Sequence, residues 1–167
     1  MQRLTSIVAA AIFSSLMFAG AAAAQDMKRG GHGAMDKDMH GSKDEAVNMV
    51  KKGVAYIRAH GKEKGYAEIT REGSPFKDRD LYLVVYALDG LVLAHGQNHK
   101  MVDKNLIGLR DIDGKAYIRE TVERARTEER FWVDHKFTNP VMRQIRPMRM
   151  YCERLSDAVI CSGHFMM

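Results

Sequence analysis

The dipeptide Asp89-Gly90 constrains the fold most strongly, because it separates two apolar runs that have the composition of β-strands. Leu81–Leu88 is rich in β-branched and aromatic residues, and Leu91–His95 continues the pattern after the turn. Asp-Gly between two such runs is a strong short-range signal of a β-hairpin. The sequence therefore predicts two neighbouring antiparallel strands.

Three further strands are predicted in the C-terminal part of the chain, over Arg130–Phe137, Pro147–Leu155 and Ala158–Phe165. The last two are separated only by Ser156-Asp157, which predicts a tight turn. Short links of this kind join antiparallel neighbours, whereas parallel strands need long crossovers. Together with the hairpin, these segments predict a five-stranded antiparallel sheet.

Helical periodicity is present in three segments. The first begins at Ser42, where Glu45 completes a capping box, and its apolar residues recur at three- and four-residue steps as far as about His60. A shorter helix is predicted over Glu63–Ile69, and Ala116–Arg126 has a charged amphipathic pattern. We therefore expect an α+β domain with a long N-terminal helix and with helices packed on one face of the sheet.

The N-terminal end has the pattern of an export signal. After Arg3, the run from Ile7 to Ala24 is apolar or small except for two serines, and it ends in four alanines. This pattern predicts a signal peptide over residues 1–24, cleaved near Ala24, and a periplasmic protein. An uncleaved membrane anchor is the alternative. No later run is long enough to span a bilayer, so the processed chain is not expected to cross the membrane.

The residues after the predicted cleavage site form two regions. Residues 25–42 contain Gly, Asp, Lys, Met and His without a periodic apolar face, which predicts a disordered leader. Residues 43–167 are expected to form a single domain. The formal net charge is +5, but basic and acidic residues are interspersed, as in Arg119-Glu120 and Glu123-Arg124. A nucleic-acid partner is therefore not expected.

A colinear series of short strings resembles the single Cache domains of bacterial extracytoplasmic sensors. The strings are Arg79–Tyr82, Val85–Gly90, Val92–Gly96, Lys104–Leu106, Asp111–Lys115, Trp132–Asp134, Asn139-Pro140 and Tyr151–Arg154. The resemblance implies a PAS-like fold, with the long N-terminal helix along one side of the sheet and a small pocket over the other. It also implies binding of a small metabolite, often a short carboxylate, in chemoreceptors and histidine kinases.

Two departures from the family pattern qualify these implications. No transmembrane helix or signalling domain follows in the sequence, so the chain is expected to bind a ligand without transmitting a signal by itself. The family often has a lysine after the proline of the fourth strand, where this chain has Met148.

Strand alternation and the family implication together give the candidate ligand-binding residues. Tyr82 and Tyr86 share one face of the first long strand, and each combines an apolar ring with a hydroxyl donor. A carboxylate also needs a cation, for which the candidates are Arg79, favoured by its family-like string, Lys136 and Arg149. The remaining candidates are His95, at the end of the second strand, and Trp132, on the same face of its strand as Lys136.

The two cysteines have a structural interpretation. If Ser156-Asp157 is a two-residue turn, Cys152 lies opposite Cys161 in the hairpin, at a position where side chains are close. The oxidising compartment favours a disulfide. Two buried free thiols are the alternative.

We therefore interpret the chain as a sensor or ligand-presenting module that binds a small organic acid and acts on a membrane-bound receptor or kinase. No catalytic or cofactor motif appears, so neither an enzyme nor a cofactor is expected. The competing interpretations are an uncharacterised enzyme and a Met/His metal-handling protein, since thioether and imidazole ligands suit Cu(I). The metal hypothesis rests on the leader residues Met27, His32, Met35, Met39 and His40, with Asp36 and Asp38 between them.

Overall fold

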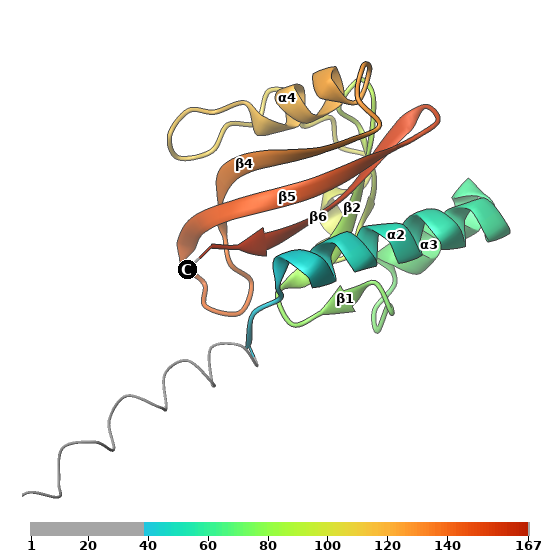
Figure 1. Ribbon diagram of the computed structural model, residues 1–167, viewed down its shortest axis with the longest axis horizontal. Helices are drawn as coiled ribbons and strands as arrows, with labels where there is room; N and C mark the ends of the chain where they lie inside the picture. Colours follow the sequence, from blue (N-terminus) through green and yellow to red (C-terminus); the bar gives the residue numbers. More distant parts are fainter. Residues whose placement is uncertain (1–38, 167) are drawn as a thin grey trace, which may run out of the picture. The chain divides into compact units, whose positions relative to one another are not determined.

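Six strands form one antiparallel sheet in the computed structural model, which describes residues 39–166 (Figure 1). The strands lie in the order β1-β2-β6-β5-β4, and β3 pairs with β2. Their bounds are β1 Lys77–Asp78, β2 Leu81–Ala87, β3 Val92–His95, β4 Arg130–Thr138, β5 Ile145–Leu155 and β6 Ala158–Phe165. All the pairings are antiparallel, as the short predicted links require.

The sixth strand is a correction to the five predicted. β1 has only two residues, both exposed, and it pairs with the start of β2 across the turn Arg79-Asp80. A two-residue strand has no alternation of apolar and polar positions to detect. The five longer strands occupy the predicted segments, although β5 begins at Ile145, two residues before Pro147.

The helical elements of the described residues are α2 Lys43–His60, α3 Lys62–Thr70, the 3-10 turn η1 His99–Met101 and α4 Tyr117–Arg124. The capping box at the start of α2 is present, because the Ser42 hydroxyl accepts from the Glu45 N–H and the Glu45 carboxylate accepts from the Ser42 N–H. α2 covers the range in which the first helix was predicted. α4 ends two residues before Arg126.

The helices cover both faces of the sheet, which corrects the prediction that they pack on one. α2 and α3 lie on one side and α4 on the other (Figure 1). Leu81, Leu83 and Val85 of β2 belong to the core beneath α2 and α3. Tyr82, Val84 and Tyr86 belong to a second core beneath α4. Because both faces of the sheet carry apolar side chains, helices or loops have to shield each face from water.

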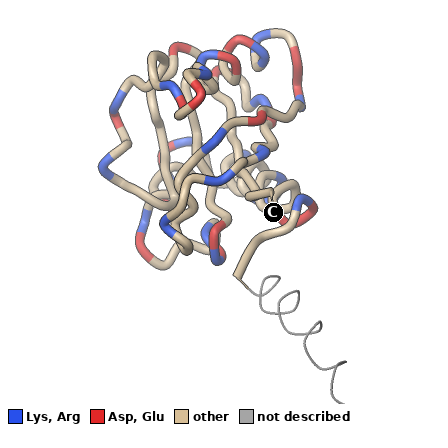
Figure 2. The backbone as a smooth tube through the Cα atoms, turned by 90° about the vertical axis from the view of Figure 1, so that its left-hand side faces the viewer, with Lys and Arg blue, Asp and Glu red and all other residues tan. Residues whose placement is uncertain are grey.

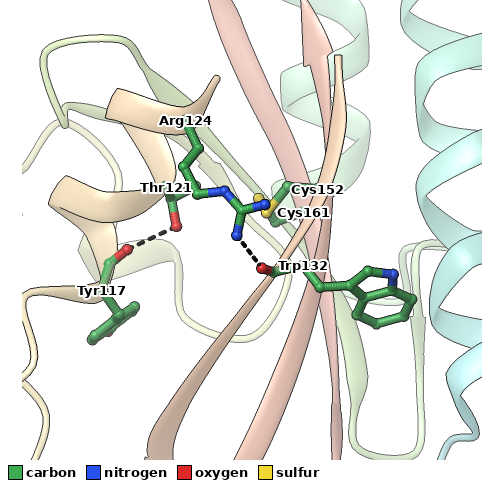
Figure 3. Close-up of a disulfide and its surroundings, with 6 residues drawn as sticks. All are labelled: Tyr117, Thr121, Arg124, Trp132, Cys152 and Cys161. Carbon is green, nitrogen blue, oxygen red and sulfur yellow. Dashed lines mark hydrogen bonds between the residues drawn. A yellow bond between two sulfur atoms is a disulfide. The ribbon is translucent and has the colours of Figure 1, made fainter. Parts of the chain in front are cut away.

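The C-terminal hairpin has the predicted register and the predicted disulfide. Leu155 lies opposite Ala158, Cys152 lies opposite Cys161, and the two cysteines are bonded. Both sulfurs lie in the core on the α4 side of the sheet, whereas the Trp132 ring points toward α2 (Figure 3).

The outer edge of β4 is occupied by side chains from the segment that covers this second core. Arg124 donates to the Trp132 carbonyl at 2.6 Å (Figure 3). Lys115 donates to the Asp134 carbonyl, and the Asp111 carboxylate accepts from the Lys136 N–H at 3.0 Å. These bonds fix the segment 111–124 beside the sheet.

Asp80 connects the start of the described chain with two loops. Its carboxylate, which is fully buried, accepts from the Gly41 N–H at 2.7 Å and from the Asn139 amide at 3.0 Å, and it pairs with His40 at 2.7 Å. His40 and Gly41 fall within the range predicted as a leader, so the last residues of that range are held by the domain. The predicted signal peptide and residues 25–38 lie outside the described residues.

Basic and acidic residues are interspersed along the domain, in agreement with the sequence pattern (Figure 2). Of the helices in residues 39–166, none has both the length and the hydrophobicity to cross a bilayer.

Candidate functional site

A cavity of about 210 Å³ lies between the sheet and the α4 side of the molecule. Strands β2, β3, β4, β5 and β6 contribute residues to its lining, and so do α4 and the segment between β3 and α4. The residues that line it are Tyr82, Val84, Tyr86, His95, Met101, Leu106, Leu109, Tyr117, His135, Phe137, Met148, Met150, Cys161, Ser162 and Gly163. A cavity of this volume suits a small ligand.

Three tyrosines line this cavity. Tyr82 and Tyr86 come from the predicted face of β2, and Tyr117 is the first residue of α4. Burial raises the pKa of all three phenols above the ordinary value of 10. Each hydroxyl therefore keeps its proton at neutral pH and can donate or accept a hydrogen bond.

His95 is the best-defined donor of the site. Its Nδ1 accepts from the backbone N–H groups of Gln97 at 3.2 Å and Asn98 at 3.1 Å. Because a backbone N–H can only donate, the ring proton is on Nε2. Burial lowers the pKa of His95 to about 4, and its ring stacks on Tyr82 with 5.3 Å between centroids. The imidazole is therefore neutral at pH 7, with one N–H directed away from the backbone that it binds.

His135 and Tyr117 are cavity residues that the sequence analysis did not select. Their rings stack with 4.0 Å between centroids and an interplanar angle of 7°. Burial lowers the pKa of His135 to about 4, and its buried Nδ1 has no hydrogen-bond partner among the described residues. The available signal was strand alternation, since His135 shares a face with Phe131, Val133 and Phe137.

Trp132 and Lys136, the predicted site residues on β4, lie outside the cavity. The Trp132 ring packs 5.0 Å from that of Tyr151, with the Lys43 ammonium 5.3 Å from its centroid. Lys136 pairs with Asp113 at 2.8 Å. Strand alternation placed Trp132 and Lys136 on one face of β4, and it is the opposite face, with His135 and Phe137, that lines the cavity.

The other two predicted cations are also engaged elsewhere. Arg149 makes two hydrogen bonds to Asp134, at 2.6 and 2.8 Å. Arg79 occupies the turn between β1 and β2, where it pairs with Asp78 at 2.8 Å and Glu45 at 2.6 Å. Of the seven predicted ligand-binding residues, the structure brings Tyr82, Tyr86 and His95 together at the cavity.

Met148 lies in the cavity wall, at the position where the family pattern often has a lysine. It is 3% exposed, and its side chain packs over Gly163, where an added Cβ would lie 2.1 Å from the Met148 methyl group. The site is thus apolar where a cation was expected.

The arrangement is suited to binding by hydrogen bonds and apolar contact. Within residues 39–166, no group of three or more His, Cys, Asp or Glu side chains is placed to hold a metal ion. Met39 and His40 are the only members of the predicted metal-binding cluster in this range, and the others lie outside the described residues.

A protein-family model described as Single Cache domain 2 matches residues 34–166. The chain belongs to this family. It is a Cache sensor domain with a PAS-like α+β fold, as the colinear strings predicted. No curated protein matches the chain.

Solved structures of similar fold include three sensor proteins. A methyl-accepting chemotaxis protein from Vibrio parahaemolyticus has 20% sequence identity and a TM-score of 0.64, over 74% of this chain and 87% of that chain. A Cache chemosensory domain, solved to explain carboxylic acid recognition, has 15% identity and a TM-score of 0.59, over 74% and 92%. The periplasmic sensor domain of a chemotaxis protein has 20% identity and a TM-score of 0.55, over 74% and 90%. At these identities the likeness shows the fold alone.

Proposed function

We propose that this Cache domain is a periplasmic binding protein for a small organic acid, whose bound state is presented to a membrane-bound receptor or kinase. The observation that carries the proposal is the cavity in which Tyr82, Tyr86 and His95 meet. It combines a mostly apolar wall with a few directed hydrogen-bonding groups, which is the usual composition of a small-molecule site. The carboxylic acid recognition named for one structural neighbour supports the ligand class.

The proposed mechanism is reversible capture without chemical change. The His95 Nε2–H and the tyrosine hydroxyls would bind the carboxyl group, and side chains such as Met101 and Leu106 would contact the carbon chain. Leu106 and Leu109, in the loop after β3, form part of the cavity wall. A ligand that contacts them would change the conformation of this loop at the surface, where a partner could detect it.

Thermal unfolding of the full chain with a panel of organic acids of two to six carbons tests the proposal. A ligand that binds the native state alone stabilises it, by about 2.7 kcal/mol at a hundredfold excess over Kd. We expect at least one acid to raise the melting temperature by several degrees.

Two matched variants locate the binding. Val84→Phe fills the cavity and should remove the shift, whereas Val141→Phe, at an exposed position outside the cavity, should retain it. Circular dichroism verifies that both variants are folded, and Tyr86→Phe provides a milder change if Val84→Phe is not. A shift that survives in Val84→Phe, or no shift with any acid, contradicts the proposal.

A further inference from the structure

The described residues that line the cavity include no Asp, Glu, Lys or Arg. The polar side chains there are phenols and imidazoles, because the hydroxyl of the remaining polar residue, Ser162, contacts the Met49 sulfur of α2 at 3.8 Å on the other face of the sheet. Phenols whose pKa is raised and imidazoles whose pKa is about 4 carry no charge at neutral pH. The wall is therefore uncharged.

The charged groups packed behind this wall do not favour an anion. Lys115 is paired with Glu120 at 3.0 Å and donates to the Asp134 carbonyl. The Asp111 carboxylate accepts the N–H groups of Lys115 and Lys136, and its charge acts to raise the pKa of both His135 and Tyr117. The Asp111 carboxylate is thus one of the charges that act on the stacked rings of His135 and Tyr117.

A carboxylate that enters such a cavity loses its hydration and gains no cation in return. Neutral donors replace only part of that loss, and a buried ion without a counter-charge is shifted toward its neutral form. A protonated carboxyl group has different needs, namely one donor for its carbonyl oxygen and one acceptor for its O–H. The residues that line the cavity can supply both, because the neutral His95 ring has an Nε2–H donor and a phenol oxygen can accept.

We propose that the cavity binds its ligand in the uncharged form: an organic acid enters as the protonated carboxylic acid, and a primary amide of the same size can take its place. This inference rests on the function proposed above and specifies its ligand class. It also explains why the predicted cations Arg79, Lys136 and Arg149 lie elsewhere.

Three acid–amide pairs of equal size test the inference: acetate with acetamide, propionate with propionamide, and butyrate with butyramide. Affinities are measured by calorimetry with the full chain at pH 6, 7 and 8. The fraction of protonated acid falls about tenfold for each pH unit above the pKa of the acid, and the apparent affinity falls with it. We expect the best amide to bind at least tenfold more tightly than its acid at pH 7, with an affinity independent of pH.

The acid of that pair should gain about tenfold in affinity for each unit by which the pH is lowered. Acid binding that is unchanged from pH 6 to pH 8 and tighter than amide binding would overturn the inference while leaving the proposed function intact. Failure of all six compounds to bind, together with no thermal shift for any acid of the two-to-six-carbon panel, would overturn both.

Met148→Lys provides an independent test, because it places a cation in the cavity wall. We expect it to reverse the preference, so that the acid of the best pair binds more tightly than the amide at pH 7. The same substitution at Met142, which is exposed and outside the cavity, should leave the preference for the amide unchanged. An unchanged preference in a folded Met148→Lys variant contradicts the inference.

Discussion

His95 combines a structural role with the ligand-binding role proposed for its ring. Its Nδ1 holds the backbone of Gln97 and Asn98 as the chain leaves β3, and its backbone N–H donates to the Thr70 hydroxyl at 3.3 Å. The same bonds determine which ring nitrogen carries the proton. The donor offered to a ligand is thus oriented before any ligand arrives, which reduces the entropy cost of binding.

Truncation of Arg79 should affect mainly stability, whereas truncation of Tyr86 should affect mainly ligand affinity. Arg79→Ala removes partly exposed ion pairs to Glu45 and Asp78, so we expect a loss of about 1 kcal/mol or less in stability and ligand affinity within twofold of the wild type. Tyr86→Phe removes one neutral hydrogen bond at the cavity, so we expect affinity to fall by up to about tenfold. Calorimetric titration with the tightest ligand measures both. A large affinity loss in Arg79→Ala alone would place the ligand at the β1–β2 turn.

At this scale, three of the seven predicted ligand-binding residues, Tyr82, Tyr86 and His95, line the cavity. The phenols of β2 were identifiable because one face of the strand is aliphatic and the other carries two tyrosines. On β4, the sequence does not show which face is covered by α4 and which by α2. We therefore assigned the ligand to the face that carries the charged residue Lys136. Tyr117 could not be placed, because its position depends on how α4 docks on the sheet.

The loop between β3 and α4 is attached to the β2–β3 turn by backbone hydrogen bonds. The Leu106 N–H donates to the Gly90 carbonyl at 2.9 Å, and the Val92 N–H donates to the Lys104 carbonyl at 2.9 Å. These bonds hold Leu106 against the cavity, so the turn that organises the hairpin also positions the wall opposite the sheet.

Gly90→Ala should therefore be costly. The φ of Gly90 is +91°, and an added Cβ would lie 2.7 Å from the Ile107 Cβ and 3.0 Å from its backbone. We expect the free energy of unfolding to fall by roughly 2 kcal/mol or more, measured by urea denaturation. Gly114→Ala is the matched control, because its φ is +83° but nothing lies within 4 Å of the added atom. Equal losses in the two variants would show that the contact with Ile107 is unimportant.

The elements that the sequence predicted well are those defined by local chemistry. Asp89-Gly90 marked the first hairpin, and Ser156-Asp157 set the register that brings Cys152 opposite Cys161. The bridge closes a short loop and contributes about 2–3 kcal/mol on the chain-entropy model. The position of α4 on the face opposite α2 and α3 was not predicted, because no local sequence pattern determines on which side of a sheet a helix will pack.

At the scale of the whole molecule, two buried histidines of the cavity, His95 and His135, are expected to make stability depend on pH. In the unfolded chain a histidine has a pKa near 6.5, whereas burial lowers the pKa of His95 and His135 to about 4. Between these values the unfolded chain binds more protons than the folded one, so stability is present above pH 6.5 and is lost as the pH falls toward 4. We expect a loss of roughly 2–3 kcal/mol for each ring.

Urea denaturation at pH 7, 6, 5 and 4.5 measures this slope. His135→Gln removes one titrating ring and should flatten it, whereas Phe137→Leu, a neighbouring cavity residue that does not titrate, should lower stability at every pH and leave the slope unchanged. A wild-type slope that His135→Gln does not alter would show that folding does not lower the pKa of His135.

The capped edge of β4 has a consequence for contacts between molecules. A free edge strand is a template to which a strand of another chain can add, and this is a common route to aggregation. Here Arg124 and Lys115 occupy two outward carbonyls, and Asp111 occupies an outward N–H. Because these three outward groups of β4 are already engaged within one molecule, we expect them to hinder the addition of a strand from another chain at this edge. Loss of the three side chains should make that addition easier.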